Sequence, residues 1–166
     1  AGPSTGLPTR TQQADLSLAH NLSHGDTEHI VLLPGSVKEC FEFGQTCFDL
    51  AEEFQTLVIV LSDLDLGMNF WLSDEFKIPQ QPYNRGKVMS AEKLQQTAFA
   101  RYKDVDGDGI PYRTLPGTRH DKAAFLTRGS GHNEMAQYTE DSPQYKIVLD
   151  RLRKKFQTAA TRVPQP

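Results

Sequence analysis

The chain has 166 residues, with 18 Lys and Arg against 21 Asp and Glu, which gives a formal net charge of −3. This balance disfavours a protein that binds nucleic acid or an anionic membrane mainly by electrostatic attraction. Hydrophobic residues make up 37% of the chain, so a core is expected, but a thin one. At this length we expect one domain, or else two small ones.

The sequence predicts a soluble, cytoplasmic protein. No apolar run reaches the roughly 18 residues of a membrane span, and the opening residues lack the charged and apolar regions of a secretory signal. The two cysteines, Cys40 and Cys47, have no CxxC motif and no histidine at zinc-ligand spacing. Reduced, buried thiols are the simplest interpretation.

Upstream of the main apolar pattern, we expect Thr11 to be the N-cap of a short helix from Gln12 to about His20. We expect Leu16 and Ala19 to face inward from this helix.

The clearest structural pattern spans residues 29–63. Two unbroken apolar runs, 29–33 and 57–61, are typical of buried strands in a parallel sheet. Between them, Ser36 and Glu39 form a capping box, which predicts the start of a helix. The sequence therefore predicts a parallel β-α-β unit, and an α/β fold class. Apolar side chains at three- and four-residue steps predict one helical stripe made of Val37, Cys40, Phe41, Gly44, Cys47, Phe48, Ala51 and Phe54.

Regular patterns end after this unit and return near the C-terminus. Residues 67–141 are rich in proline and glycine, and only Ser90 predicts a capped helix there. A final helix is predicted to begin at Asp141, with Pro143 in its first turn. We expect an apolar stripe of Tyr145, Val148, Leu149, Leu152 and Phe156, and a solvated face of Arg151, Arg153, Lys154 and Lys155.

Two acidic motifs each have a functional and a structural interpretation. Residues 104–109, DVDGDG, match the first half of a calcium loop, but Leu115 stands where the bidentate glutamate belongs. The alternative is a turn whose carboxylates accept hydrogen bonds from their own backbone. Asp63 and Asp65 follow the 57–61 run, where ligands of α/β sheets gather, although a turn or cap role is favoured.

The opening segment, residues 2–11, combines glycines, prolines and hydroxyl side chains just before the first predicted helix. Exposed backbone amides near a helix N-terminus suit a carboxylate or phosphate ligand. An N-terminal tail without a ligand is an equally good interpretation of these residues alone.

Three longer strings resemble one known family. AGPSTGLPTRTQQADL, LSDLDLGMNFWLSD and RYKDVDGDGIPYRTLPGTRHDKAAFLTRGSGHNEMAQYTED are similar to the α subunit of 2-oxoacid:ferredoxin oxidoreductases, especially the 2-oxoglutarate type. The similarity covers essentially the whole chain. It implies oxidative decarboxylation of a 2-oxoacid to an acyl-CoA, with ferredoxin as the electron acceptor.

The resemblance also implies a site, a cofactor and partners. In this family thiamine diphosphate is shared between the pyrimidine-binding domain of the α subunit and a β subunit, which supplies Mg²⁺ and the iron–sulfur cluster. Gly2, Pro3, Ser4, Thr5 and Gly6 would then lie beside the cofactor. Thr9 would help to hold the 2-oxoacid. No residue of this chain is assigned a catalytic or metal-binding role.

Some of the family's residues have no counterpart here. A substrate-binding arginine immediately before the GPSTG string and an activating glutamate from the first half of the domain are both missing. We therefore expect a fragment, inactive alone and prone to oligomerise. Its expected parts are the second half of a pyrimidine-binding domain (1–66), an irregular connector (67–141), and a C-terminal helix with linker (142–166).

The alternative hypothesis is a non-enzymatic interaction module, or a calcium-binding module that uses the DVDGDG loop. A structural remnant without any ligand is a third interpretation. Nucleic acid is not an expected partner under any of the three.

Overall fold

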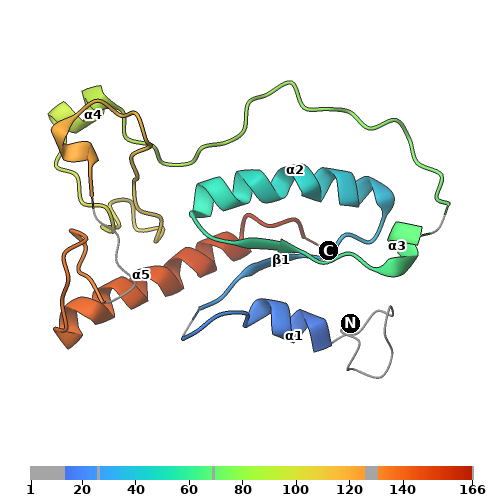
Figure 1. The fold of residues 1–166 in the computed structure, drawn as a ribbon, viewed down its shortest axis with the longest axis horizontal. Helices are drawn as coiled ribbons and strands as arrows, with labels where there is room; N and C mark the ends of the chain where they lie inside the picture. Colours follow the sequence, from blue (N-terminus) through green and yellow to red (C-terminus); the bar gives the residue numbers. More distant parts are fainter. Residues whose placement is uncertain (1–13, 26, 69, 126–130, 166) are drawn as a thin grey trace. The chain divides into compact units, whose positions relative to one another are not determined.

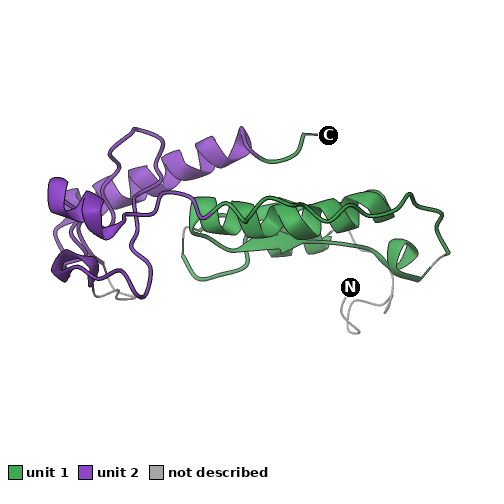
Figure 2. Cartoon of the chain, turned by 90° about the horizontal axis from the view of Figure 1, so that it is seen from above, with its two compact units in different colours: residues 1–84, 163–166 green, residues 85–162 purple. Residues whose placement is uncertain are grey.

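The computed structural model describes residues 14–25, 27–68, 70–125 and 131–165. The chain forms two compact units, one of residues 1–84 with 163–166 and one of residues 85–162, shown in different colours in Figure 2. The predicted division at residues 66 and 141 stays a prediction.

The first unit contains the predicted parallel β-α-β arrangement (Figure 1). Strand β1 (Ile30–Leu32) pairs in parallel with strand β2 (Val58–Val60), and helix α2 (Val37–Phe54) connects them. Helix α1 (Ala14–His20) contacts β1, and α2 contacts β2, so the two helices lie on opposite sides of the sheet. The α/β prediction is therefore confirmed. The paired residues are Ile30 with Val58, Val31 with Ile59 and Leu32 with Val60.

The burial of this unit differs from the prediction in two places. In α1, Ala19 is buried as predicted, but the prediction for Leu16 is wrong because this side chain is 43% exposed. In α2 the buried side chains are Leu50 and Phe54, and Phe48 is 59% exposed. The single predicted stripe of α2 is therefore wrong in part, because the helix uses two apolar faces.

The second apolar face of α2 is covered by the extended segment 70–84, which follows helix α3 (Leu64–Met68). The ring of Phe41 stacks on Phe76 with centroids 4.6 Å apart, and Phe48 meets Tyr83 at 5.8 Å. The backbone amide of Asn84 donates to Asp49 Oδ1 over 2.7 Å. Figure 1 shows the segment running along the outer side of α2. The sequence did not predict this covering, because the segment lacks periodicity.

The second unit is built around helix α5 (Ser142–Ala160), with the short helix α4 (Ala91–Gln96) and a 3-10 turn, η2 (Asp121–Ala123). The predicted caps are confirmed: Ser90 Oγ accepts from the Lys93 amide, and Asp141 Oδ2 accepts from the Gln144 amide. The buried apolar side chains of this unit are Met89, Leu94, Ile110, Val148 and Ala159.

The buried face of α5 differs from the predicted one. Tyr145 is 46% exposed, while Arg151 and Lys155, predicted to be solvated, are only 9% and 6% exposed. The cause is the turn of residues 104–109, which packs against this face. Arg151 Nη1 donates to the Gly109 carbonyl over 2.9 Å, and Thr158 Oγ1 donates to the Asp108 carbonyl over 2.7 Å.

Three buried or half-buried cations lie together in this unit. The guanidinium groups of Arg101 and Arg151 lie 4.8 Å and 6.0 Å from the centre of the Tyr102 ring. Burial lowers the pKa of both arginines. Burial, with the positive charges of Arg151 and Arg101 in addition, lowers the pKa of Lys155 to about 8. Each charge therefore destabilises the fold unless an anion compensates it.

Two glycines of the 104–109 turn provide a matched test of its packing on α5. Gly107 and Gly109 have similar positive φ angles, 76° and 79°, but only a Cβ at Gly109 would meet the helix backbone, 2.2 Å from the Lys155 nitrogen. Gly107→Ala should cost about 1–2 kcal/mol, the cost of a side chain in this conformation. Gly109→Ala should cost more than about 4 kcal/mol, because the turn must leave the helix. Equal losses in urea unfolding would contradict this packing.

Lys155 predicts a specific pH dependence of stability. Its folded pKa, about 8, lies below the ordinary value of 10.5, so the folded state releases the proton first as the pH rises. Below pH 8 the penalty for the buried charge is complete, and it disappears between about pH 8 and pH 10.5. Relative to Lys155→Met, the wild-type free energy of unfolding should rise by about 3 kcal/mol over this window in urea titrations. A difference that does not change with pH would refute the assignment.

Candidate functional site

The residues predicted to bind cofactor and substrate, Gly2, Pro3, Ser4, Thr5, Gly6 and Thr9, lie outside the described residues. The described part of the chain begins at Ala14 in α1. The candidate site is therefore described from the elements that follow, starting at the carboxyl ends of the two strands.

The carboxyl ends of β1 and β2 both lead into short polar segments. After β1 the chain reaches Gly35 and Ser36 and then enters α2. After β2 it reaches Asp63, whose Oδ1 accepts a hydrogen bond from the Leu66 amide over 2.8 Å at the start of α3. The favoured cap role of Asp63 is therefore confirmed. Because parallel strands end at one edge of a sheet, this edge is the usual ligand side of an α/β fold.

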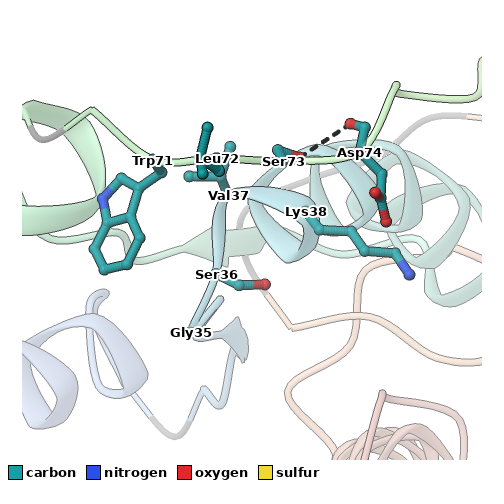
Figure 3. A pocket seen from close by; sticks show the side chains of 8 residues that line it. All are labelled: Gly35, Ser36, Val37, Lys38, Trp71, Leu72, Ser73 and Asp74. Carbon is teal, nitrogen blue, oxygen red and sulfur yellow. Dashed lines mark hydrogen bonds between the residues drawn. The ribbon is translucent and has the colours of Figure 1, made fainter.

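A pocket of about 480 Å³ lies at this edge (Figure 3), a volume within the range of small-molecule sites. One wall is the start of α2 and the other is the segment that follows α3. Figure 3 shows Trp71 and Leu72 on the second wall, with the indole of Trp71 extending to the side away from Ser36 and Val37. The lining residues are Gly35, Ser36, Val37, Lys38, Trp71, Leu72, Ser73 and Asp74.

The first turn of α2 already carries its own anion. Ser36 Oγ accepts from the Glu39 amide over 3.1 Å, and Glu39 Oε2 accepts from the Gly35 amide over 2.7 Å. The predicted capping box is confirmed, except that the amide that donates to Glu39 belongs to Gly35, one residue upstream of the N-cap residue used in the standard motif. Because Glu39 is a carboxylate at the helix N-terminus, the pocket offers little attraction to a second anion.

The apolar wall of the pocket suits an uncharged ring or an aliphatic chain. The indole of Trp71 is held by its Nε1, which donates to the Asp65 carbonyl over 2.9 Å. Lys38 Nζ, at the polar side, lies 3.8 Å from Glu42 Oε1. Sequence reasoning missed Trp71 and its neighbours, because they follow the strand in an irregular segment. The available signal was their position, soon after the predicted end of a parallel strand.

The DVDGDG segment is a self-satisfied turn. Asp104 accepts from the amides of Gly107 and Gly109, each over 2.9 Å, and Asp108 accepts from the Ile110 amide over 2.9 Å. Among the described residues there is no group of three or more His, Cys, Asp or Glu side chains that could hold a metal ion. The motif is thus a turn whose carboxylates accept hydrogen bonds from their own backbone, and its geometry does not favour calcium binding.

Lys87 neutralises the remaining carboxylates of this turn. Its Nζ lies 2.6 Å from Asp106 Oδ2 and 2.8 Å from Asp108 Oδ2. Burial alone would lower the pKa of Lys87, but the hydrogen bonds to Asp106 and Asp108 outweigh it, so the pKa is raised. The ammonium group thus takes the place that a cation would need.

The two cysteines are free and half-buried. Cys47 Sγ donates to the Gly44 carbonyl over 3.2 Å, and burial raises the pKa of this thiol. A thiol with a raised pKa is a poor nucleophile, so Cys47 has a packing role. In the part of the chain that the structure describes, no helix combines the length and the apolar character needed to cross a membrane.

Comparison with known proteins identifies the family of this chain. Residues 1–148 match the model of the pyruvate flavodoxin/ferredoxin oxidoreductase, thiamine diphosphate-binding family. The chain is 36% identical over 166 residues to 2-oxoacid:ferredoxin oxidoreductase 2, subunit alpha, from Aeropyrum pernix, covering 99% of this chain and 25% of that protein. It is 52% identical over 123 residues to 2-oxoglutarate synthase subunit KorA from Methanothermobacter marburgensis, covering 74% of this chain and 29% of that subunit.

A solved structure agrees with these sequences. The 2-oxoglutarate:ferredoxin oxidoreductase from Magnetococcus marinus, with 2-oxoglutarate, coenzyme A and succinyl-CoA bound, matches 99% of this chain and 28% of its own, with a TM-score of 0.78 and 29% identity. The chain thus spans between 25% and 29% of the length of these relatives. By its sequence and its fold, it belongs to the pyruvate flavodoxin/ferredoxin oxidoreductase family, in the thiamine diphosphate-binding part.

Proposed function

We propose that the chain is part of the α subunit of a thiamine diphosphate-dependent 2-oxoacid:ferredoxin oxidoreductase that acts on 2-oxoglutarate. The observation that carries this proposal is the family match over residues 1–148, together with 52% identity to a 2-oxoglutarate synthase subunit. In the proposed reaction, 2-oxoglutarate and CoA give succinyl-CoA and CO₂, and two electrons leave singly to ferredoxin.

The described residues fit a shared cofactor site. The pocket at the carboxyl edge of β1 and β2 has an apolar wall of Val37, Trp71 and Leu72, which suits contact with an aromatic ring. When bound, thiamine diphosphate would supply the carbanion chemistry that decarboxylation requires. The chain's own part is to shape one side of the site, to keep water from it, and to orient the oxoacid.

Thr9 and the loop Gly2–Gly6 complete the proposed site. Glycines in this loop allow the backbone to approach a ligand closely, and the Thr9 hydroxyl would donate to a carboxylate oxygen of the oxoacid. The assignment rests on the match of GPSTGLPT to the family's string. This assignment adds site residues to the proposed function. It can be wrong even if the proposed function is right.

The remaining cofactors are assigned to a partner. The chain has two cysteines, and an iron–sulfur cluster commonly needs four thiolates, so these residues alone do not hold a cluster. On the family resemblance, we assign the cluster and Mg²⁺ to a β subunit. The free thiols of Cys40 and Cys47 agree with a reducing, cytoplasmic location. Both named relatives above are subunits of larger enzymes.

An exposed apolar strip is the surface that we assign to this β subunit. Met68 and Ile78 are 72% and 75% exposed, and Phe70 and Leu72 are fully exposed. Residues 63–78, the sequence that contains the strip, carry four carboxylates (Asp63, Asp65, Asp74 and Glu75) against one lysine, Lys77, and this net negative charge would repel a second copy of the same surface. The expected occupant is therefore a β-subunit surface that is apolar at its centre and basic at its rim.

The first test is activity of the complete α subunit with its β subunit. Ferredoxin reduction with 2-oxoglutarate should require both thiamine diphosphate and CoA, and its absence would overturn the proposed function. In this enzyme Thr9→Ala should raise KM for 2-oxoglutarate about tenfold, the loss of a hydrogen bond worth roughly 1–3 kcal/mol to a charged group. Thr97→Ala, at the exposed end of α4, is the control. An unchanged KM in Thr9→Ala would remove Thr9 from the site.

The second test addresses the strip. Phe70→Ser with Ile78→Ser should weaken binding of the complete α subunit to the β subunit at least tenfold in sedimentation experiments, and leave the Tm of the free α subunit unchanged. Val105→Ser with Ile147→Ser removes other exposed apolar groups and is the control. A lower Tm with unchanged association would instead show that other parts of the α subunit cover the strip.

A further inference from the structure

The second unit contains three cations that have no anionic partner among the described residues. Arg101, Arg151 and Lys155 take part in none of the ion pairs between described side chains. Arg151 and Lys155 are more than nine-tenths buried. Lys155 Nζ has one ring contact, with Phe156 at 5.2 Å. The positive charges are therefore withdrawn from water without the compensation that buried charges normally have.

Several N–H donors of this cluster are left over. Arg101 Nε, Arg101 Nη1 and Arg151 Nε are buried, and none of them donates to an acceptor within hydrogen-bonding distance. Asp104 and Glu134 attract Arg151 only from beyond ion-pair distance, and both oxygens of Asp104 already accept backbone amides. An orphaned buried donor costs about 1–3 kcal/mol, and more when it is charged. A group that accepts these donors is thus the missing part of the arrangement.

The aromatic rings fix the positions of the two guanidinium groups. Arg101 lies over the rings of Tyr102 and Phe125, at 4.8 Å and 5.3 Å, and Arg151 lies 6.0 Å from the Tyr102 ring. Tyr102 in turn stacks on His132 with centroids 4.0 Å apart. Because these contacts hold the two guanidinium groups in place despite their repulsion, this part of the cluster is preorganised for an anion.

We propose that Arg101, Arg151 and Lys155 form a binding site for a phosphate group. A phosphate carries a charge of about −1.5 to −2 and three acceptor oxygens, whereas a carboxylate carries one charge and two oxygens. Three cations with several spare donors match the phosphate better on both counts. The residues of the site all belong to the second unit, and none of them lines the pocket of Figure 3. Its existence does not depend on the proposed function.

The most direct test follows Lys155 itself. In the complete α subunit without phosphate, the Lys155 ammonium should titrate near its shifted pKa of about 8 in NMR spectra of the side chain. Saturating inorganic phosphate should raise this midpoint by about one unit or more, because a nearby opposite charge favours the protonated form. An unchanged midpoint would overturn the proposal. An ordinary midpoint before phosphate is added would also overturn it, since an anion of the subunit would then already fill the site.

Variants test the same site through stability. Inorganic phosphate should raise the Tm of the complete subunit in a saturable way, above the effect of sodium chloride at equal ionic strength. The increase should be lost in Lys155→Met and in Arg101→Met and kept in Lys154→Met, whose side chain is exposed on the same helix. Equal responses of Lys154→Met and Lys155→Met would show that phosphate binds elsewhere. If Lys155→Met fails to fold, Arg101→Met and the NMR titration still decide.

Two probes separate the possible sources of the phosphate. Inorganic phosphate tests for the free ion, and phenyl phosphate tests for a phosphate that is part of a larger molecule. Tighter binding of phenyl phosphate would assign the site to a phosphate monoester, and binding of inorganic phosphate alone would assign it to the free ion. Failure of both probes to shift either the Tm or the Lys155 midpoint would refute the proposal.

Discussion

The parallel pairing of β1 with β2 is the constraint on which the candidate site depends. Three residue pairs, from Ile30 with Val58 to Leu32 with Val60, bring the carboxyl ends of both strands to one edge. The first end positions Ser36 and the capped start of α2, and the second leads through Asp63 to Trp71. Without this pairing the two walls of the pocket would come from segments with no reason to meet. A two-stranded sheet is marginal alone, so the packing of α1 and α2 on it is equally necessary.

Features set by local hydrogen bonds could be predicted from the sequence. The caps at Ser36, Ser90 and Asp141 each join a side chain to an amide three residues away, so the pattern contains the whole interaction. The buried face of α5 could not be predicted in this way. Arg151 and Lys155 are buried because the turn at Gly109, some forty residues earlier, packs on them. Helical periodicity alone favours the apolar stripe instead.

The candidate site also contains features that the sequence predicts and features that it does not. The DVDGDG turn shows that a ligand-like spacing of carboxylates is also the spacing that satisfies a tight turn, and only the directions of the oxygens distinguish the two. The pocket wall at Trp71 depends on an irregular segment, for which periodicity gives no signal. Thr9 and the Gly2–Gly6 loop were assigned by resemblance to a family, and their roles stay predictions.

The contacts of Lys87 also divide the second unit into cooperative parts. Lys87 and Asp108, 21 residues apart, close a loop that contains α4, and the Arg113 amide donates to the Lys87 carbonyl at the same place. The enclosed segment is also held by the buried side chains of Met89 and Leu94, so its amide hydrogens should exchange as one group, and only when this packing is released together with the ion pairs. Since these ion pairs are partly exposed, salt weakens the closure. Ionic strength therefore contributes to how often the loop that contains α4 opens, alongside the burial of Leu94.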